Sequence, residues 1–216
     1  MNRIYQITWN TIQERYKVLT YALTDTLFGP MIVVRSPYGI VYCGFVSPQQ
    51  ERVDALLSSI KYSLKNDTFE QVEETQLVLD EWKRDMVVFS DSSLDLNCLS
   101  GTEPASEDAE RQHVQIEKVK LDIHSTPFQR LVWENLLTVG YGETLSYQQF
   151  AQRIGRVSAT RAVASAIAMN PVSLLIPCHR IIRQNGEYGE YHWGMSLKKA
   201  ILDHEKGKQP DSFTLF

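Results

Sequence analysis

The sequence contains few cysteines, and their spacing matches no common metal or disulfide pattern. Cys43, Cys98 and Cys178 are far apart in the 216 residues, they are odd in number, and none belongs to a Cys-x-x-Cys pair. This arrangement argues against a disulfide framework and against a cysteine-based zinc site. We therefore predict free thiols in a reducing compartment and no bound metal.

Long apolar runs are also missing. No stretch approaches the roughly 20 apolar residues needed to span a bilayer. Residues 1–6 lack the apolar core of a signal peptide. We expect a cytoplasmic protein with no membrane partner, or a nuclear protein if the source is a eukaryote.

Neither sign of charge is in strong excess. The net charge of −4 argues weakly against a nucleic-acid binder, but it is unevenly distributed. Residues 1–115 contain 10 Lys and Arg against 17 Asp and Glu, whereas residues 116–216 contain 12 against 9. A surface that faces phosphates is therefore expected in the C-terminal half.

The N-terminal half has the pattern of a small structural domain, predicted to span residues 1–99. Three β-rich runs at 21–24, 31–35 and 40–46 are separated by short Gly- and Pro-containing turns, which predicts an antiparallel meander. Cys43 lies inside the third run and is expected in the core. Apolar spacing predicts a helix over 50–62. For residues 1–18 the sequence indicates only a terminal extension without definite structure.

A polar, acidic stretch at 100–118 is predicted to be a linker to a second domain over 119–216. The second domain opens with a short strand at 119–123. A helix is expected to begin at Pro127 with Thr126 as its N-cap. A final helix is expected from Ser196 to His204.

Between these elements lies a helix-turn-helix pattern. Ser146 is expected to cap a helix over 147–154, which Gly155 ends, and a second helix over 159–169 ends at Asn170-Pro171. The second helix is rich in alanine and carries one charge, Arg161. Such a helix is suited to lying close against DNA and reading its shape rather than its base edges. The same pair of helices also occurs as a plain packing unit.

The segment Ile176–Ile182, with sequence IPCHRII, contains the residues best suited to chemistry. A cysteine becomes a nucleophile as a thiolate, and the adjacent His179 and Arg180 are expected to favour that state in Cys178. The alternative is a structural cysteine in the core beside a surface His-Arg pair.

Several motifs in this order resemble the O6-alkylguanine-DNA alkyltransferases, also called methylated-DNA–protein-cysteine methyltransferases. The resemblance runs from about Leu121 to Glu205 and depends on Gly142–Gln149 (GETLSYQQ), Thr160–Ala164 (TRAVA), Asn170-Pro171, Ile176–Arg180 (IPCHR), Tyr191, Trp193-Gly194 and His204-Glu205. It implies an α+β fold, with a ribonuclease-H-like α/β domain followed by a mainly helical domain that carries a winged helix-turn-helix-like DNA-binding unit. It also implies a monomer that needs no cofactor.

The activity implied by the resemblance is direct reversal of DNA damage. Cys178 would accept a methyl or small alkyl group, once and irreversibly, from O6 of guanine or O4 of thymine in double-stranded DNA. His179 would act as the base through a water, Glu205 would orient His179, and Asn170 would hold the turn at Cys178.

The resemblance also implies a set of DNA- and substrate-binding residues. Arg161 would fill the gap left by a base that is flipped out through the minor groove. Tyr147 would crowd the adjacent phosphate, and Tyr191 would help to bind O6. The remaining residues assigned to substrate or DNA binding are Ile181 through its carbonyl, Lys198 on the last helix, and His192, which with Trp193 would narrow the pocket.

Two other functions are compatible with parts of the pattern. A non-catalytic alkyltransferase-like module binds lesions without transfer, but such modules replace the cysteine that is present here. A Cys-His hydrolase would turn over repeatedly and would leave Tyr147, Arg161 and Asn170 unexplained.

Overall fold

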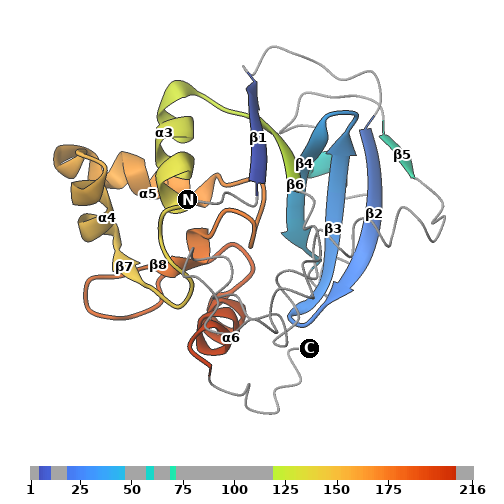
Figure 1. Ribbon diagram of the computed structural model, residues 1–216. Coiled ribbons are helices and arrows are strands. Elements are labelled where there is room, and N and C mark those ends of the chain that lie inside the picture. Colours follow the sequence, from blue (N-terminus) through green and yellow to red (C-terminus); the bar gives the residue numbers. More distant parts are fainter. Residues whose placement is uncertain (1–4, 11–18, 47–56, 61–68, 72–118, 208–216) are drawn as a thin grey trace, which may run out of the picture.

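The computed structural model describes residues 5–10, 19–46, 57–60, 69–71 and 119–207. In these residues a six-stranded sheet forms one half of the molecule and helices form the other (Figure 1). The predicted linker at 100–118, most of the predicted helix over 50–62 and Cys98 lie outside the described residues.

The predicted antiparallel meander is confirmed. Strand β2 (Leu19–Thr26) pairs with β3 (Gly29–Ser36), and β3 pairs with β4 (Gly39–Phe45). These strands are rich in the β-branched residues that favour a pleated sheet. At Gly39 a Cβ atom would approach the backbone oxygen of Lys120 to 2.5 Å, so only glycine fits where β4 begins beside the neighbouring strand.

The sheet is completed by segments that are remote in sequence. Its strand order is β1-β6-β4-β3-β2-β5, with β1 (Tyr5–Asn10) and β6 (Val119–His124) in parallel and β5 (Phe69–Gln71) at the other edge. Residues 5–10 thus form an edge strand, where the sequence indicated an extension without definite structure. Strand β6 was assigned to the second domain from the sequence, but it pairs within the same sheet as the N-terminal strands. The last strand of this sheet therefore ends at His124. The division into 1–99, 100–118 and 119–216 stays a prediction.

The helices begin where their caps predict. Helix α3 (Pro127–Leu136) is preceded by Thr126, and α4 (Tyr147–Arg153) by Ser146; each cap residue forms a reciprocal capping box with the glutamine three residues later. A short 3₁₀ turn, η3 (Val157–Ala159), leads into α5 (Thr160–Ala168). The last described helix is α6 (Met195–Glu205).

One hydrophobic core joins the sheet to the helices. Met31, Val33 and Ile123 of the sheet share a buried cluster with Trp133 of α3 and Ile167 of α5. The indole of Trp133 donates to the Ala166 carbonyl at 2.8 Å, so its one polar atom is satisfied. Among the described residues no helix has the length and apolarity to cross a membrane.

Candidate active site

The segment that leads from α5 to Cys178 is held by one side chain. The amide of Asn170 donates to the Ile176 carbonyl at 2.7 Å and to the Val172 carbonyl at 3.4 Å, and its oxygen accepts from the Val172 N–H at 3.1 Å. The loop also contains Leu174 with φ of 66°, a backbone conformation rarely adopted by residues other than glycine. The hydrogen bonds to Asn170 thus connect both ends of this loop, while the role of Asn170 in holding the turn at Cys178 stays a prediction.

The same loop is fastened to the N-terminal sheet. The backbone of Cys43 in β4 donates to the Pro171 carbonyl at 2.9 Å and accepts from the Ser173 N–H at 2.8 Å. The Cys43 thiol itself is fully buried, and burial raises its pKa to about 12. Cys43 is therefore a core residue, as predicted, while its backbone helps to position the loop before Cys178.

Cys178 begins a short 3₁₀ turn, η4 (Cys178–Arg180), and is 9% exposed. Burial raises the pKa of its thiol, while Asn170, the charge of Lys198 and backbone N–H groups lower it without cancelling the effect of burial. The resting side chain is therefore a protonated thiol at neutral pH. Nucleophilic attack requires a nearby group that accepts the thiol proton.

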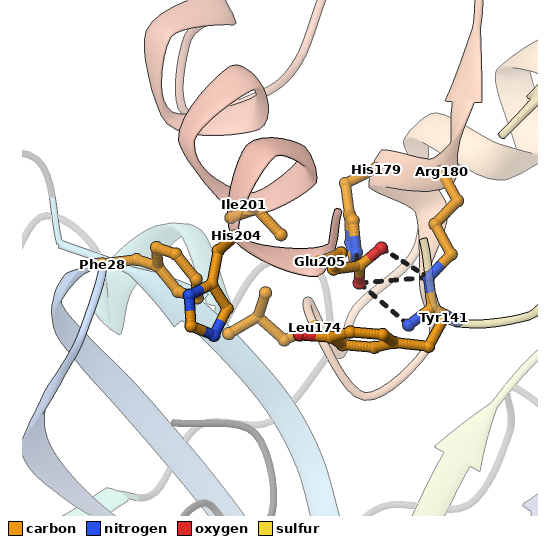
Figure 2. Close-up of a pocket in the computed structure, with 8 residues that line it drawn as sticks. All are labelled: Phe28, Tyr141, Leu174, His179, Arg180, Ile201, His204 and Glu205. Carbon is orange, nitrogen blue, oxygen red and sulfur yellow. Dashed lines mark hydrogen bonds and ion pairs between the residues drawn. The ribbon is translucent and has the colours of Figure 1, made fainter. Parts of the chain in front are cut away.

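His179 of η4 and Glu205, the last residue of α6, form a buried pair. Nε2 of His179 lies 2.8 Å from Oε1 of Glu205, and their side chains are 1% and 5% exposed (Figure 2). Burial alone would raise the pKa of Glu205, but the bonds and charges of His179 and Arg180 outweigh it and lower that pKa to about 2. The carboxylate therefore accepts, and Nε2 carries the proton.

The other ring nitrogen, Nδ1 of His179, has the properties of a base. It is buried and has no hydrogen-bond partner within the described part of the chain. Burial lowers the pKa of His179, and its bond to Glu205 raises it only in part, so the ring is neutral at neutral pH. With Nε2–H facing Glu205, Nδ1 holds a free lone pair, on a residue that directly follows Cys178 in the chain.

The cation whose charge lowers the pKa of the Cys178 thiol is Lys198 rather than Arg180. Lys198 is 1% exposed, donates from Nζ to the Ile181 carbonyl at 2.5 Å, and lies 6.0 Å from the ring centroid of Tyr191. Burial lowers its pKa to about 8, and Cys178 acts in the opposite direction. Lys198 therefore faces the interior near Cys178 instead of an exposed DNA surface. The expectation that Arg180 acts on the thiol is not supported, since its guanidinium points to Glu205.

Two tyrosines converge on the same place from different elements. Tyr147 is the first residue of α4, next to the pairing of β7 (Leu145–Ser146) with β8 (Ile181–Ile182). Burial and the nearby Cys178 raise the pKa of both Tyr147 and Tyr191, so each keeps its proton at neutral pH and can donate it. The Tyr191 hydroxyl is buried without a hydrogen-bond partner among the described residues.

The loop that carries Tyr191 packs on the sheet through Trp193. The Trp193 ring lies edge-on to Phe45, Tyr191 and His192, with ring centroids 5.7, 5.4 and 4.8 Å apart. A Cβ atom at Gly44 would meet Trp193 at 2.9 Å, so the absence of a side chain there makes room for the indole. His192 is exposed, while the half-buried Trp193 is the residue that limits space near Tyr191.

Arg161 lies apart from this cluster, on the exposed face of α5. Its side chain has no hydrogen bond or ion pair to any described residue, and the exposed positions that follow it within the helix are small, Ala162, Ser165 and Ala168, before the exposed Met169 at the C-cap. The opposite face buries Val163, Ala166 and Ile167. The exposed face of α5 therefore consists of short side chains, with Arg161 as its one long, positively charged side chain.

A small cavity of about 20 Å³ lies next to the His179–Glu205 pair and is lined in part by both residues (Figure 2). Its lining includes Phe28, Leu174 and Ile201 together with His204, and Cys178 is not part of it. This volume is that of one water molecule, so the cavity is too small for a nucleobase.

Changing Glu205 should alter stability in acid. The pKa of Glu205 in the folded protein lies below its ordinary value of 4.5. The ionised carboxylate therefore adds to the free energy of unfolding in full above about pH 4.5, and this contribution is lost as the pH falls toward 2. The difference corresponds to about 3 kcal/mol. Urea unfolding of wild type and Glu205→Gln at a series of pH values should show curves that converge in acid. Glu134→Gln, which alters an exposed ion pair, should run parallel to wild type, and a parallel Glu205→Gln curve would contradict the assignment.

Comparison with known proteins places these features in a common context. Residues 127–207 match the family described as 6-O-methylguanine DNA methyltransferase, DNA binding domain. A methylated-DNA–protein-cysteine methyltransferase of Mycobacterium tuberculosis is 45% identical over 98 residues, which cover 45% of this chain and 59% of that protein. The regulatory protein ada of Salmonella typhimurium is 32% identical over 189 residues, 88% of this chain and 46% of that protein. The chain thus covers less than two thirds of the length of these relatives.

Solved structures show a similar overall arrangement. The crystal structure of Mycobacterium tuberculosis OGT in complex with DNA superposes with a TM-score of 0.59 at 26% identity, covering 91% of this chain and 99% of that one. An O6-methylguanine-DNA methyltransferase from Pyrococcus kodakaraensis superposes with a TM-score of 0.55 at 20% identity. The mixed α+β fold expected from the sequence is thereby confirmed.

Proposed function

We propose that this chain, which through residues 127–207 belongs to the O6-alkylguanine-DNA alkyltransferase family, repairs DNA by moving an alkyl group from O6 of guanine to Cys178. O4 of thymine is the second expected target. The observation that carries the proposal is a buried thiol beside a neutral histidine whose free nitrogen is oriented by an ionised carboxylate. This is the nucleophile, base and orienter arrangement of a catalytic triad.

The chemistry needs no cofactor. The Cys178 proton passes, through a bridging water, to Nδ1 of His179, and Glu205 stabilises the imidazolium. The sulfur forms a bond to the alkyl carbon as the bond from that carbon to O6 breaks, and its electrons stay on O6. A protonated tyrosine, Tyr147 or Tyr191, offsets the charge on the departing guanine. The product is a thioether, so each molecule reacts once.

Access to the base requires flipping, because O6 lies inside the duplex. We propose that the exposed face of α5 enters the minor groove and that Arg161 occupies the vacated position. In this arrangement α4, α5 and the loop at 183–194 act as a winged helix-turn-helix-like unit, and the sheet is the ribonuclease-H-like domain. The protein would act as a monomer in the cytoplasm, or in the nucleus of a eukaryote.

The test is a single-turnover assay with a duplex that contains O6-methylguanine, read by intact mass spectrometry and peptide mapping. The proposal requires one methyl group per chain, located on Cys178. Tight binding without transfer would instead identify a non-catalytic lesion-binding module, and repeated turnover would identify a hydrolase. The intact His179–Glu205 pair favours transfer over the binding module.

Glu205→Gln should slow transfer without removing the acceptor. A neutral amide cannot stabilise the imidazolium, so the apparent pKa of the Cys178 thiol should rise and the transfer rate at neutral pH should fall by about 100-fold. Thiol alkylation by iodoacetamide across a pH series measures the first effect. Glu134→Gln, an exposed partner of Arg130 on α3, serves as the control. An unchanged thiol titration would remove Glu205 from the network.

A further inference from the structure

We infer that Arg180 is a positioning residue of the acceptor site, because it holds the Glu205 carboxylate against His179 and thereby decides which imidazole nitrogen carries the proton. The inference deepens the proposed function and rests on it. It assigns a role to the third residue of the Cys-His-Arg triplet that differs from the one expected from the sequence, where Arg180 was assumed to act on the thiol directly.

The contacts of Arg180 leave its guanidinium one orientation. Nε lies 3.1 and 3.0 Å from the two oxygens of Glu205, and Nη2 lies 2.8 Å from Oε1. On the far side Nη1 donates to the Val139 carbonyl at 2.7 Å, and the Tyr141 ring lies beside the guanidinium, 5.6 Å from its central carbon (Figure 2). A planar fork is needed to make these contacts together, so lysine cannot reproduce them.

Glu205 is an unfavourable place for a carboxylate without such a partner. It is the last residue of α6, where the exposed carbonyl groups give the helix end a partial negative charge. Its side chain is also buried, which disfavours the ionised form. Apart from Arg180 it receives hydrogen bonds from the neutral His179 ring and from the Gly142 N–H at 3.2 Å. Arg180 is therefore the full positive charge that compensates it.

The consequence reaches the thiol through the histidine tautomer. An ionised Glu205 can only accept, so Nε2 must donate and Nδ1 keeps its lone pair for the cysteine proton. A protonated Glu205 can donate to Nε2 instead, and the ring proton then moves to Nδ1. His179 in that tautomer cannot accept a proton at Nδ1. Loss of Arg180 should therefore disable the base without touching His179 or Cys178.

Other groups near the pair do not replace Arg180. Besides Arg180, the titratable and charged groups in the described ranges that face Glu205 or His179 are His204 on α6, Tyr141 after α3, Tyr191 on the loop before α6, and Lys198 on α6. Lys198 is directed to the Ile181 carbonyl and influences Cys178. Each of these stays in place in an Arg180 variant, so a change in the His179 tautomer would report the loss of the guanidinium alone.

The experiment measures the tautomer directly in full-length, unreacted protein without DNA. Nitrogen NMR of His179 in wild type should show the neutral Nε2–H tautomer near neutral pH. Arg180→Met, of similar length and uncharged, should show Nδ1–H appearing as the pH falls, with the acid limb of methyl transfer moved to higher pH and the rate near neutrality at least tenfold lower. Arg180→Lys should lie between the two. Arg130→Met, at an exposed ion pair on α3, should match wild type.

An Arg180→Met protein with the wild-type tautomer and an unchanged acid limb would overturn the inference. If that variant does not fold, Arg180→Lys decides: a wild-type tautomer and acid limb would refute the role, and a partial shift would support it. Failure of the proposed function is a separate result. A protein that transfers no alkyl group but shifts its tautomer would refute transfer and keep the role of Arg180 in orienting His179.

Discussion

Replacing Cys178 with alanine is expected to reduce methyl transfer to zero while the affinity for duplex DNA is retained. The thiol is the group that forms the new bond, and neither water nor the neighbouring His179 can take its place as a stable acceptor. The side chain is buried and is not part of the exposed face of α5, so DNA binding does not depend on it. Intact mass spectrometry measures the transfer, and a gel-shift titration with O6-methylguanine duplex measures the binding.

The matched control is Cys43→Ala, which removes the other buried thiol in the described residues. The hydrogen bonds between Cys43 and the loop before Cys178 are made by its backbone and remain in this variant, so it should take up one methyl group per chain. Methyl uptake by Cys178→Ala, or a modified peptide that lacks residue 178, would refute the acceptor assignment.

Arg161→Ala is expected to slow repair of duplex DNA by about 100-fold, with little change in the reaction with free O6-methylguanine nucleoside. Extruding a base costs a few kcal/mol, and a side chain that fills the gap offsets part of that cost. A loss of about 3 kcal/mol corresponds to this factor in rate. The free nucleoside needs no flipping. It should therefore be insensitive to a residue that lies apart from Cys178.

The control for Arg161 carries the same change of charge. Arg156 is exposed in the turn before α5, and Arg156→Ala should weaken DNA binding without lowering the rate at saturating duplex. Single-turnover rates at several DNA concentrations separate the two effects. Equal losses of Arg161→Ala on duplex and on nucleoside would exclude a role in flipping.

Local sequence patterns predicted the helices and the central strands well. The capping boxes at Thr126 and Ser146 depend on residues three positions apart, and the meander of β2, β3 and β4 depends on short turns, so both are visible in a short window. Strand β1 was not predicted because its pairing partner, β6, is remote in sequence. The side-chain hydrogen bond between Asn10 and Asp122, for example, joins residues 112 positions apart. The role of Arg180 left no local signal, since its partner lies 25 residues away on the last turn of another helix.

The sequence by itself predicted the main residues of the candidate site: the cysteine proposed as acceptor, the histidine next to it, the asparagine before its loop and the arginine on a helix of small residues. These features depend on neighbours in the chain or on motifs in a fixed order. The tertiary structure decided which charged groups act on each side chain of the site: it directed Arg180 to Glu205 rather than to the thiol and brought Lys198 close enough to influence Cys178. It also packed Trp193 against Gly44. Burial and hydrogen-bond partners set the protonation of these groups, and both arise only when distant segments pack together.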